Sequence, residues 1–552
     1  MSISRMLSAI KLTSFLRPQC QLAGNVRFQS QAAKQLLALN SMEICSDPPS
    51  RAAVFGVYAD ENDKTDGGIL TKAGWNYNVK KTNNRLIEVL RISGPMPKRG
   101  EVRILFALEP EKIPYYSAVA IVGLGKECLG YNSYEVIDEQ KEAIRRGVGT
   151  ACNLLTELDT DRIEVDAMEH AESAAEGAGL GIWRYQEHSS KARVMPAIDL
   201  YATPNDACDF EGWKIGLQKA AAQNLTRTLQ EMPSNLLTPT SFAQNVVEIL
   251  CKTGVNVEVK VEGWADAQLM HSFLAVGRAS CEAPIFLELS YFGGAQDERP
   301  IVLIGQGCTY DAGGICLKEY PELRNMRGDM TGAACVVAAF RAISTLRIPI
   351  NVRGLIPLCE NVIGCNSYKP GDICRSGSGK RVEVEGTEHE GTLVLADALM
   401  YAQNFCPKFI LDIGTTSGHM RNTFDEAASG VFTNSEILWQ QIKHASMHTG
   451  DRVWRLPLWD YYTTAICSTP HVDIINFGFG RGGRPCKAAA LLREFVPCGQ
   501  WMHIDATNVM VTTGKEFEYL RKGMAGRPTR TIVELLAQQT CTNVAPKLQV
   551  KN

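Results

Sequence analysis

Four carboxylates and one lysine follow apolar, strand-like segments in the second half of the chain. The carboxylates are Asp311, Asp329, Glu388 and Glu390, and Lys318 lies among them in the sequence. A pair of divalent metal ions needs several hard oxygen ligands, some of them bridging, and an open position for water. Any one of these carboxylates could be a solvated loop residue, but four of them beside glycine-rich turns favour a site. The pattern predicts a two-metal hydrolytic centre.

The elements that must position these residues predict an α/β fold. Residues 301–305 read IVLIG, an apolar run typical of a parallel strand buried on both faces, and the glycine-rich turn after it exposes Asp311. From residue 241 onward further strands alternate with helices, as in α/β domains. These strands are expected at 255–262, 285–291, 351–357 and 409–414.

The first half of the chain predicts a second, smaller domain. Strands are expected at 102–108 and 118–125 and a helix at 139–158, which is the alternation of a parallel sheet. We therefore divide the chain into an N-terminal α/β domain, a linker helix and a C-terminal α/β catalytic domain. The expected boundaries are 45–205, 206–237 and 238–545.

The first 40 residues differ from the rest in composition. They contain five basic residues and no acidic one, together with several serines and glutamines. Apolar side chains from Ile3 to Ile10 recur at helical spacing, while Lys11 and Arg17 interrupt any apolar core of a secretory signal. This composition is typical of a mitochondrial transit peptide, so residues 1–40 predict a matrix location. An unstructured basic tail is the alternative.

Composition excludes several other classes of function. The chain has 552 residues, of which 45% are hydrophobic and 21% charged, and its formal net charge is −3. A globular protein of two or three domains is therefore expected. There is no large basic block to support nucleic-acid binding. No apolar run approaches the 18 residues that a membrane span requires.

Several sequence blocks closely resemble the leucyl aminopeptidase (cytosol aminopeptidase) family. The similarity extends from about residue 227 to 505, and its blocks include NMRGDMTGAA (325–334), YKPGDICRSGSGK (368–380) and WMHIDA (501–506). It implies a C-terminal catalytic domain, a homohexamer, peptide substrates and divalent manganese or zinc. The sequence also closely resembles the mitochondrial sperm leucylaminopeptidases of flies, a group in which site residues are often replaced.

The resemblance assigns roles to individual residues. It implies metal-binding positions at Asp311, Asp329, Glu388, Glu390 and Gln306, where Gln306 replaces the family's lysine. It implies catalytic positions at Lys318 and at Thr392, which replaces an arginine. It implies a wall around the substrate's N-terminal side chain made by Met326, Thr415, Thr416 and Gly418.

Three of these positions depart from the family pattern. Gln306 offers an amide oxygen, a weaker donor than a neutral lysine amine, and Glu388 is one methylene longer than the family's aspartate. In the family the arginine holds a bicarbonate that acts as general base, whereas Thr392 cannot clamp an anion. Losing a general base typically costs about 10²–10⁴-fold in rate. We therefore expect weak or partial metal occupancy and a degraded site.

Two hypotheses follow from these departures. The first is a weak or inactive relative with a structural role in sperm mitochondria. The alternative is an active manganese or zinc metalloaminopeptidase that releases N-terminal amino acids from peptides. Assay of leucine amide hydrolysis, with a metal count, separates the two.

Cysteine is abundant, but its spacing does not predict a zinc site. The chain has 18 cysteines and none forms a C-x-x-C pair. Cys308 and Cys316 flank Asp311, which raises the alternative of a thiolate ligand. The family binds metal here through oxygen and lysine nitrogen, so we expect most of these cysteines to be small buried hydrophobic residues.

Overall fold

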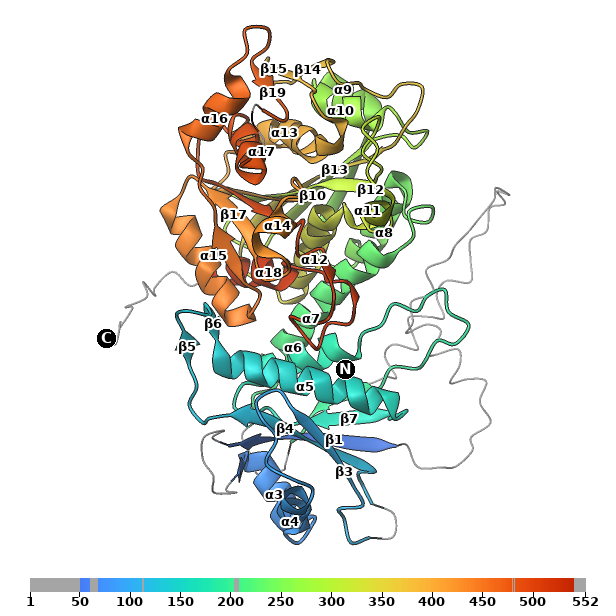
Figure 1. Cartoon of the computed structure of the whole chain (residues 1–552), viewed down its shortest axis with the longest axis vertical. Helices are drawn as coiled ribbons and strands as arrows, with labels where there is room; N and C mark the ends of the chain where they lie inside the picture. Colours follow the sequence, from blue (N-terminus) through green and yellow to red (C-terminus); the bar gives the residue numbers. More distant parts are fainter. Residues whose placement is uncertain are drawn as a thin grey trace. The chain divides into compact units, whose positions relative to one another are not determined.

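The computed structural model describes residues 50–59, 68–111, 114–202, 208–478, 480 and 482–540. The predicted transit peptide at 1–40 lies outside these ranges, as do residues 541–545 of the expected catalytic domain. The described residues form two α/β domains that follow one another along the chain, each built on a large sheet with helices packed on it (Figure 1). None of the helices in these ranges combines the length and the apolar character needed to cross a bilayer.

The N-terminal sheet is built around β1, which lies parallel to β4 and β7. Its strand order is β3-β4-β1-β7-β8, with β2 paired to β1. The expected parallel sheet is correct at its centre, whereas β2 pairs antiparallel with β1 and β3 pairs antiparallel with β4. The strands are β1 (Arg51–Tyr58), β2 (Ile69–Leu70), β3 (Val102–Phe106), β4 (Ala118–Gly125), β7 (Arg162–Val165) and β8 (Ala197–Leu200).

Helices cover both faces of this sheet. Helices α5 (Glu139–Glu157) and α6 (Ala171–Ile182) pack on one face, and α3 (Lys72–Lys80) and α4 (Arg85–Ile92) on the other. The predicted helix at 139–158 is confirmed to within one residue. Asp138 caps its first turn by accepting a hydrogen bond from the Lys141 backbone.

The linker is a single long helix, α7 (Phe210–Glu231). It is shorter than the predicted span of 206–237. Asp209 caps its start by accepting from the backbone N–H of Gly212 at 2.8 Å. The helix ends before Pro233, because proline cannot donate the next helical hydrogen bond.

The larger sheet has the order β18-β17-β20-β16-β11-β13-β10-β9, with β12 paired to β13. Its central strands β20, β16, β11 and β13 run parallel, and β10 and β9 add an antiparallel edge. The strands are β9 (Asn256–Val261), β10 (Ile285–Phe292), β11 (Ile301–Gly305), β12 (Gly307–Asp311), β13 (Asn351–Asn361), β16 (Ile410–Gly414), β17 (Ser429–Thr433), β18 (Val453–Arg455) and β20 (Trp501–Asp505).

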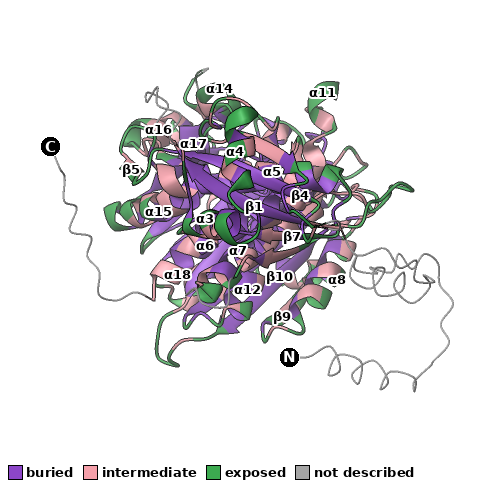
Figure 2. Ribbon diagram, turned by 90° about the horizontal axis from the view of Figure 1, so that it is seen from below, coloured by how far each residue is buried: buried purple, intermediate pink, exposed green. Residues whose placement is uncertain are grey.

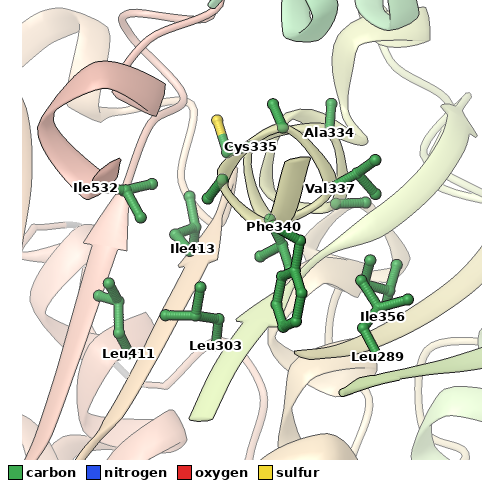
Figure 3. Packing of buried hydrophobic residues seen from close by; sticks show 14 of the residues in the cluster. Leu289, Leu303, Ala334, Cys335, Val337, Phe340, Ile356, Leu411, Ile413 and Ile532 are labelled. Carbon is green, nitrogen blue, oxygen red and sulfur yellow. The ribbon is translucent and has the colours of Figure 1, made fainter. Parts of the chain in front are cut away.

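Strand β11 is buried along its whole length, as the apolar run at 301–305 predicts. Figure 2 shows buried residues along the strands and exposed residues mainly on the outer helices and loops. Leu303 and Ile413 point toward Phe340 of α12 (Thr331–Thr345) in one core (Figure 3). Val302 and Ile304 point to the opposite core, which lies under α13 (Glu390–Ala402) and α17 (Arg484–Arg493). Strand β13 runs four residues beyond its predicted end at Pro357. Its far end is held by parallel pairing with β12, a long-range contact.

Two glycines allow α12 to approach the strand ends closely. A Cβ at Gly332 would lie 2.0 Å from the carbonyl oxygen of Ile413, and one at Gly305 would lie 2.5 Å from that of Gly332. Hydrogen is therefore the only side chain that fits at either position. This contact brings the start of α12 against the carboxyl ends of β11 and β16, where ligands bind in open α/β sheets.

A buried cluster of charged side chains connects helices α5 and α6 of the N-terminal domain with helices α7 and α18 (Thr529–Gln538). Glu176 of α6 accepts from Arg145 of α5 and from Arg530 of α18, each at 2.6 Å. Arg145 also pairs with Glu142 at 2.5 Å, and Arg530 donates to Gln223 of α7 at 2.6 Å. All five side chains are almost fully buried. Opposite charges are therefore paired and hydrogen-bonded where water cannot solvate them.

Candidate metal centre

The side chain of Gln306 lies between two carboxylates at the carboxyl end of β11. Its amide nitrogen donates to Asp329 Oδ2 at 2.8 Å and to Glu390 Oε1 at 3.0 Å. Its amide oxygen accepts from the backbone N–H of Thr415 at 2.8 Å. The residue is fully buried, so these bonds replace hydration. A neutral amide thus holds the two carboxylates together where the family has a lysine.

Local structure fixes both carboxylates. Asp329 follows the 3₁₀ turn η1 (Met326–Gly328), and its Oδ1 accepts from the Thr415 hydroxyl at 2.6 Å. Glu390 is the first residue of α13 and follows the 3₁₀ turn η2 (Thr387–His389). The start of this helix is a favourable place for an anion, because the helix dipole is positive there.

Asp311, at the end of β12, is engaged by three donors. Its Oδ2 accepts from the ammonium group of Lys318. Its Oδ1 accepts from the backbone of Gly313 at 2.7 Å and from Asn361 Nδ2 at 2.8 Å. The Lys318 nitrogen also lies 3.5 Å from the sulfur of Met326. The structure therefore brings Asp311, Lys318 and Met326 to the same end of the sheet.

Cys308 contributes a donor that the sequence analysis did not place at the centre. Donor atoms of Cys308, Asp329 and Glu390 all lie within 4.8 Å of one another. Cys308 is fully buried, as expected for a small hydrophobic residue, but its neighbours are carboxylates. Alternation along an extended chain puts residues 306 and 308 on one face, and that signal was available from the sequence.

Glu388 does not belong to this group. Its side chain is 34% exposed, and its Oε1 lies 3.7 Å from His389 Nε2. Its Oε2 is buried without a hydrogen-bond partner. Thr392 is buried in the first turn of α13, where its hydroxyl donates to the carbonyl oxygen of His389 at 3.1 Å. No charge therefore stands at position 392.

A small cavity lies beside Thr392. Its volume of about 10 Å³ is room for roughly one water molecule. The ring of His389 stacks on the ring of Phe477 with 4.5 Å between their centroids. The guanidinium carbon of Arg484 lies 3.7 Å from the centroid of the Phe477 ring. Arg484 lines the cavity together with Thr416 and Ser417.

The expected substrate wall is only partly directed at the centre. Thr415 contacts Asp329, whereas the hydroxyl of Thr416 donates to the buried Asp505 at 3.0 Å. A Cβ at Gly418 would meet nothing within 4 Å, so this position opens to solvent. The Thr416 hydroxyl is thus bonded within the protein and not directed at a substrate.

Burial and mutual repulsion hold the carboxylates near protonation. Burial, then the charge of Asp311, raises the pKa of Asp329 from 3.8 to about 6. Burial and the charges of Asp311 and Asp329 raise the pKa of Glu390 well above its ordinary range. Burial lowers the pKa of Lys318, but the charge of Asp311 outweighs it and the net shift is upward. The centre therefore favours added positive charge.

The Asp329 shift predicts a specific dependence of stability on pH in metal-free protein. A folded-state pKa above the unfolded value gives stability that is present below about pH 4 and is lost as pH rises through about 6. Asp329→Asn should remove that loss. Between about pH 4 and about pH 6, the free energy of unfolding of the variant should therefore rise by about 3 kcal/mol relative to that of the wild type. Urea unfolding with a chelator present measures it. Asp297→Asn, at an exposed carboxylate, is the control and should show no such gain.

The donor set fits one divalent ion better than two. One thiol and two carboxylates converge, while Asp311 is occupied by Lys318 and Glu388 faces His389. Two ions would need more ligands than the three donors that converge here. The residues present fit a single ion.

Comparison with known proteins agrees with this architecture. The model for the catalytic domain of the cytosol aminopeptidase family matches residues 224–533, and that for its N-terminal domain matches 54–192. Cytosol aminopeptidase of Bos taurus is 41% identical over 490 residues, which cover 88% of this chain and 92% of the relative. That of Homo sapiens is 40% identical and covers 93% and 97%.

A solved structure extends the comparison to three dimensions. The bottromycin maturation enzyme BotP in complex with Mn superposes with a TM-score of 0.74 at 26% sequence identity. The match covers 89% of this chain and all of the BotP chain. Both domains, in order, and nearly the whole length of the relatives are therefore accounted for, and the chain belongs to the cytosol aminopeptidase family.

Proposed function

We propose that this chain is a family member whose peptidase activity is strongly weakened and which serves a structural role. The observation that carries the proposal is the Gln306 amide, hydrogen-bonded to both Asp329 and Glu390. When bound, the family's metal ions activate water for attack on the peptide bond. In this chain a neutral amide binds two carboxylates that the ions would use, and Thr392 supplies no clamp for a general base.

The position of Glu388 supports the same proposal. A ligand position must be correct to about 0.2 Å, and the Glu388 carboxylate turns toward His389 and not toward Asp329 and Glu390. Meanwhile the two sheets, their cores and the close helix contact at Gly332 are complete. The proposal thus accounts for a complete scaffold beside an altered set of site residues.

The test is hydrolysis of leucine p-nitroanilide with saturating manganese or zinc, beside bovine cytosol aminopeptidase as the active reference. We expect a kcat/KM lower by at least about 10²-fold, the usual cost of a lost general base. Elemental analysis after dialysis should find at most one ion per chain. A rate close to the reference, with two ions bound, would contradict the proposal.

The second candidate is an active manganese or zinc aminopeptidase. It is favoured by the convergence of Asp311, Lys318, Asp329 and Glu390 at one end of the sheet. Its substrates would be peptides with free N-termini. The same assay decides between the candidates, because only this one expects a rate near that of the reference.

Location and assembly are further parts of the proposal. The composition of residues 1–40 supports import into the mitochondrial matrix, and resemblance to the fly sperm proteins supports an abundant sperm protein. The family resemblance supports a homohexamer, and closed symmetric assemblies are the usual state of soluble oligomers.

A further inference from the structure

Three buried donors from different elements converge at the centre. They are the thiol of Cys308 on β12, the carboxylate of Asp329 after η1 and that of Glu390 at the start of α13. Each residue is at most 3% exposed. Their donor atoms lie within 4.8 Å of one another. Ligand atoms of one tetrahedral zinc ion lie roughly 3.3–3.7 Å apart at zinc–ligand distances of about 2.0–2.3 Å, so side-chain movements of about 1 Å bring all three to bonding distance.

The neighbouring residues orient this group. Gln306 donates to one oxygen of each carboxylate and fixes the pair side by side. The Thr415 hydroxyl holds the second oxygen of Asp329 at 2.6 Å. Each carboxylate oxygen has two lone pairs, so these bonds leave lone pairs for a metal. Outer hydrogen bonds of this kind orient metal ligands in proteins.

Cys308 is held only by weak bonds, whereas Asp311 is held by three strong donors. The Cys308 thiol contacts the carbonyl oxygen of Tyr310 at 3.4 Å and hydrogen-bonds with the Cys359 thiol, and thiols are weak donors and acceptors. Asp311 is bound to the ammonium of Lys318, to Asn361 and to the Gly313 backbone. The donor set has therefore changed from oxygen and nitrogen toward sulfur and oxygen.

We propose that Cys308, Asp329 and Glu390 bind a single thiophilic divalent cation, with the Cys308 sulfur as a direct ligand. Thiolate ligands favour zinc and cobalt, whereas manganese prefers oxygen donors. On binding, the S–H bond breaks, a sulfur–metal bond forms and the proton leaves to solvent. The inference rests on the proposed function only in placing one ion at this site.

Cobalt is the probe, because a thiolate–cobalt bond gives a charge-transfer absorption band in the near ultraviolet. Metal-free full-length protein titrated with Co²⁺ should develop this band and saturate at one ion per chain. Cys308→Ser and Cys308→Ala should abolish it. Cys359→Ser is the matched control, because Cys359 is equally buried and pairs with Cys308 across the sheet, and it should keep the band.

Competition with zinc gives a second measurement. Cys308→Ser should weaken zinc binding by at least about ten-fold, a cost typical even of outer-sphere changes, and leave manganese binding little changed. Thermal melting of each metal-free variant checks that it folds. Cobalt bound by wild type without the band, a band that persists in both Cys308 variants, or no cobalt binding would each overturn the proposal.

The outcome is independent of the peptidase assay. A highly active protein that shows the cobalt–thiolate band would overturn the proposed loss of activity and leave the Cys308 ligand standing. An inactive protein without the band would support the proposed loss of activity and overturn the Cys308 ligand.

Discussion

Simultaneous replacement Gln306→Lys, Glu388→Asp and Thr392→Arg should raise aminopeptidase activity by at least about 10²-fold. The triple variant restores a nitrogen ligand, the shorter carboxylate and the anion clamp together. Each single replacement should change the rate little, because residues that act as a unit are not additive.

Initial rates on leucine p-nitroanilide with saturating zinc or manganese measure this effect. The control adds Glu390→Gln to the triple variant, which removes a carboxylate of the centre and should return the rate to that of the wild type. Equal rates for wild type and triple variant, with both folded and metal-loaded, would show that the three departures are not the cause of weak activity.

Glu176→Gln should lower the free energy of unfolding by about 3–5 kcal/mol, the usual cost of breaking a buried ion pair from one side. Glu176 is 1% exposed and accepts from both Arg145 and Arg530. Without its charge, Arg145 keeps its pair with Glu142, whereas Arg530 loses the carboxylate with which it pairs. Since these residues lie on helices of both sheets, the loss should shift the unfolding of both domains together.

Urea unfolding followed by tryptophan fluorescence and by circular dichroism measures the shift. Glu157→Gln is the matched control, because Glu157 pairs with Arg184, Arg193 and Arg521 but is 46% exposed. Exposed pairs contribute at most about 1 kcal/mol. Similar losses in the two variants would contradict the assigned importance of the buried cluster.

The elements were the most predictable part of this fold. The apolar run at 301–305 is confirmed as β11 with the same bounds, because a strand buried on both faces leaves an uninterrupted hydrophobic signature. The end of β13 was not predictable. Pro357 suggested a strand end, but pairing with β12 carries the strand to Asn361, and that contact is remote in sequence.

The sequence indicated several residues that the structure brings together, but not how they are bonded. The motifs pointed to Asp311, Lys318, Asp329 and Glu390, which the structure brings to one end of the sheet. That Lys318 would pair with Asp311, and Gln306 with Asp329, depends on rotamers set by packing among β12, α12 and α13. Cys308 remained only an alternative thiolate ligand, because its place near Asp311 in the sequence does not reveal what the thiol faces.

The bonding of Gln306 also bears on the evolutionary history of the site. Its amide satisfies one donor and two acceptors at once, and a Cβ at Gly391 or Gly414 would lie only 2.6 or 2.8 Å from its oxygen. A Gln306→Lys mutation therefore breaks these hydrogen bonds, and it brings no gain in activity until positions 388 and 392 have also changed. If activity is weakened as proposed, its recovery would therefore require several substitutions together, which selection on single substitutions rarely supplies.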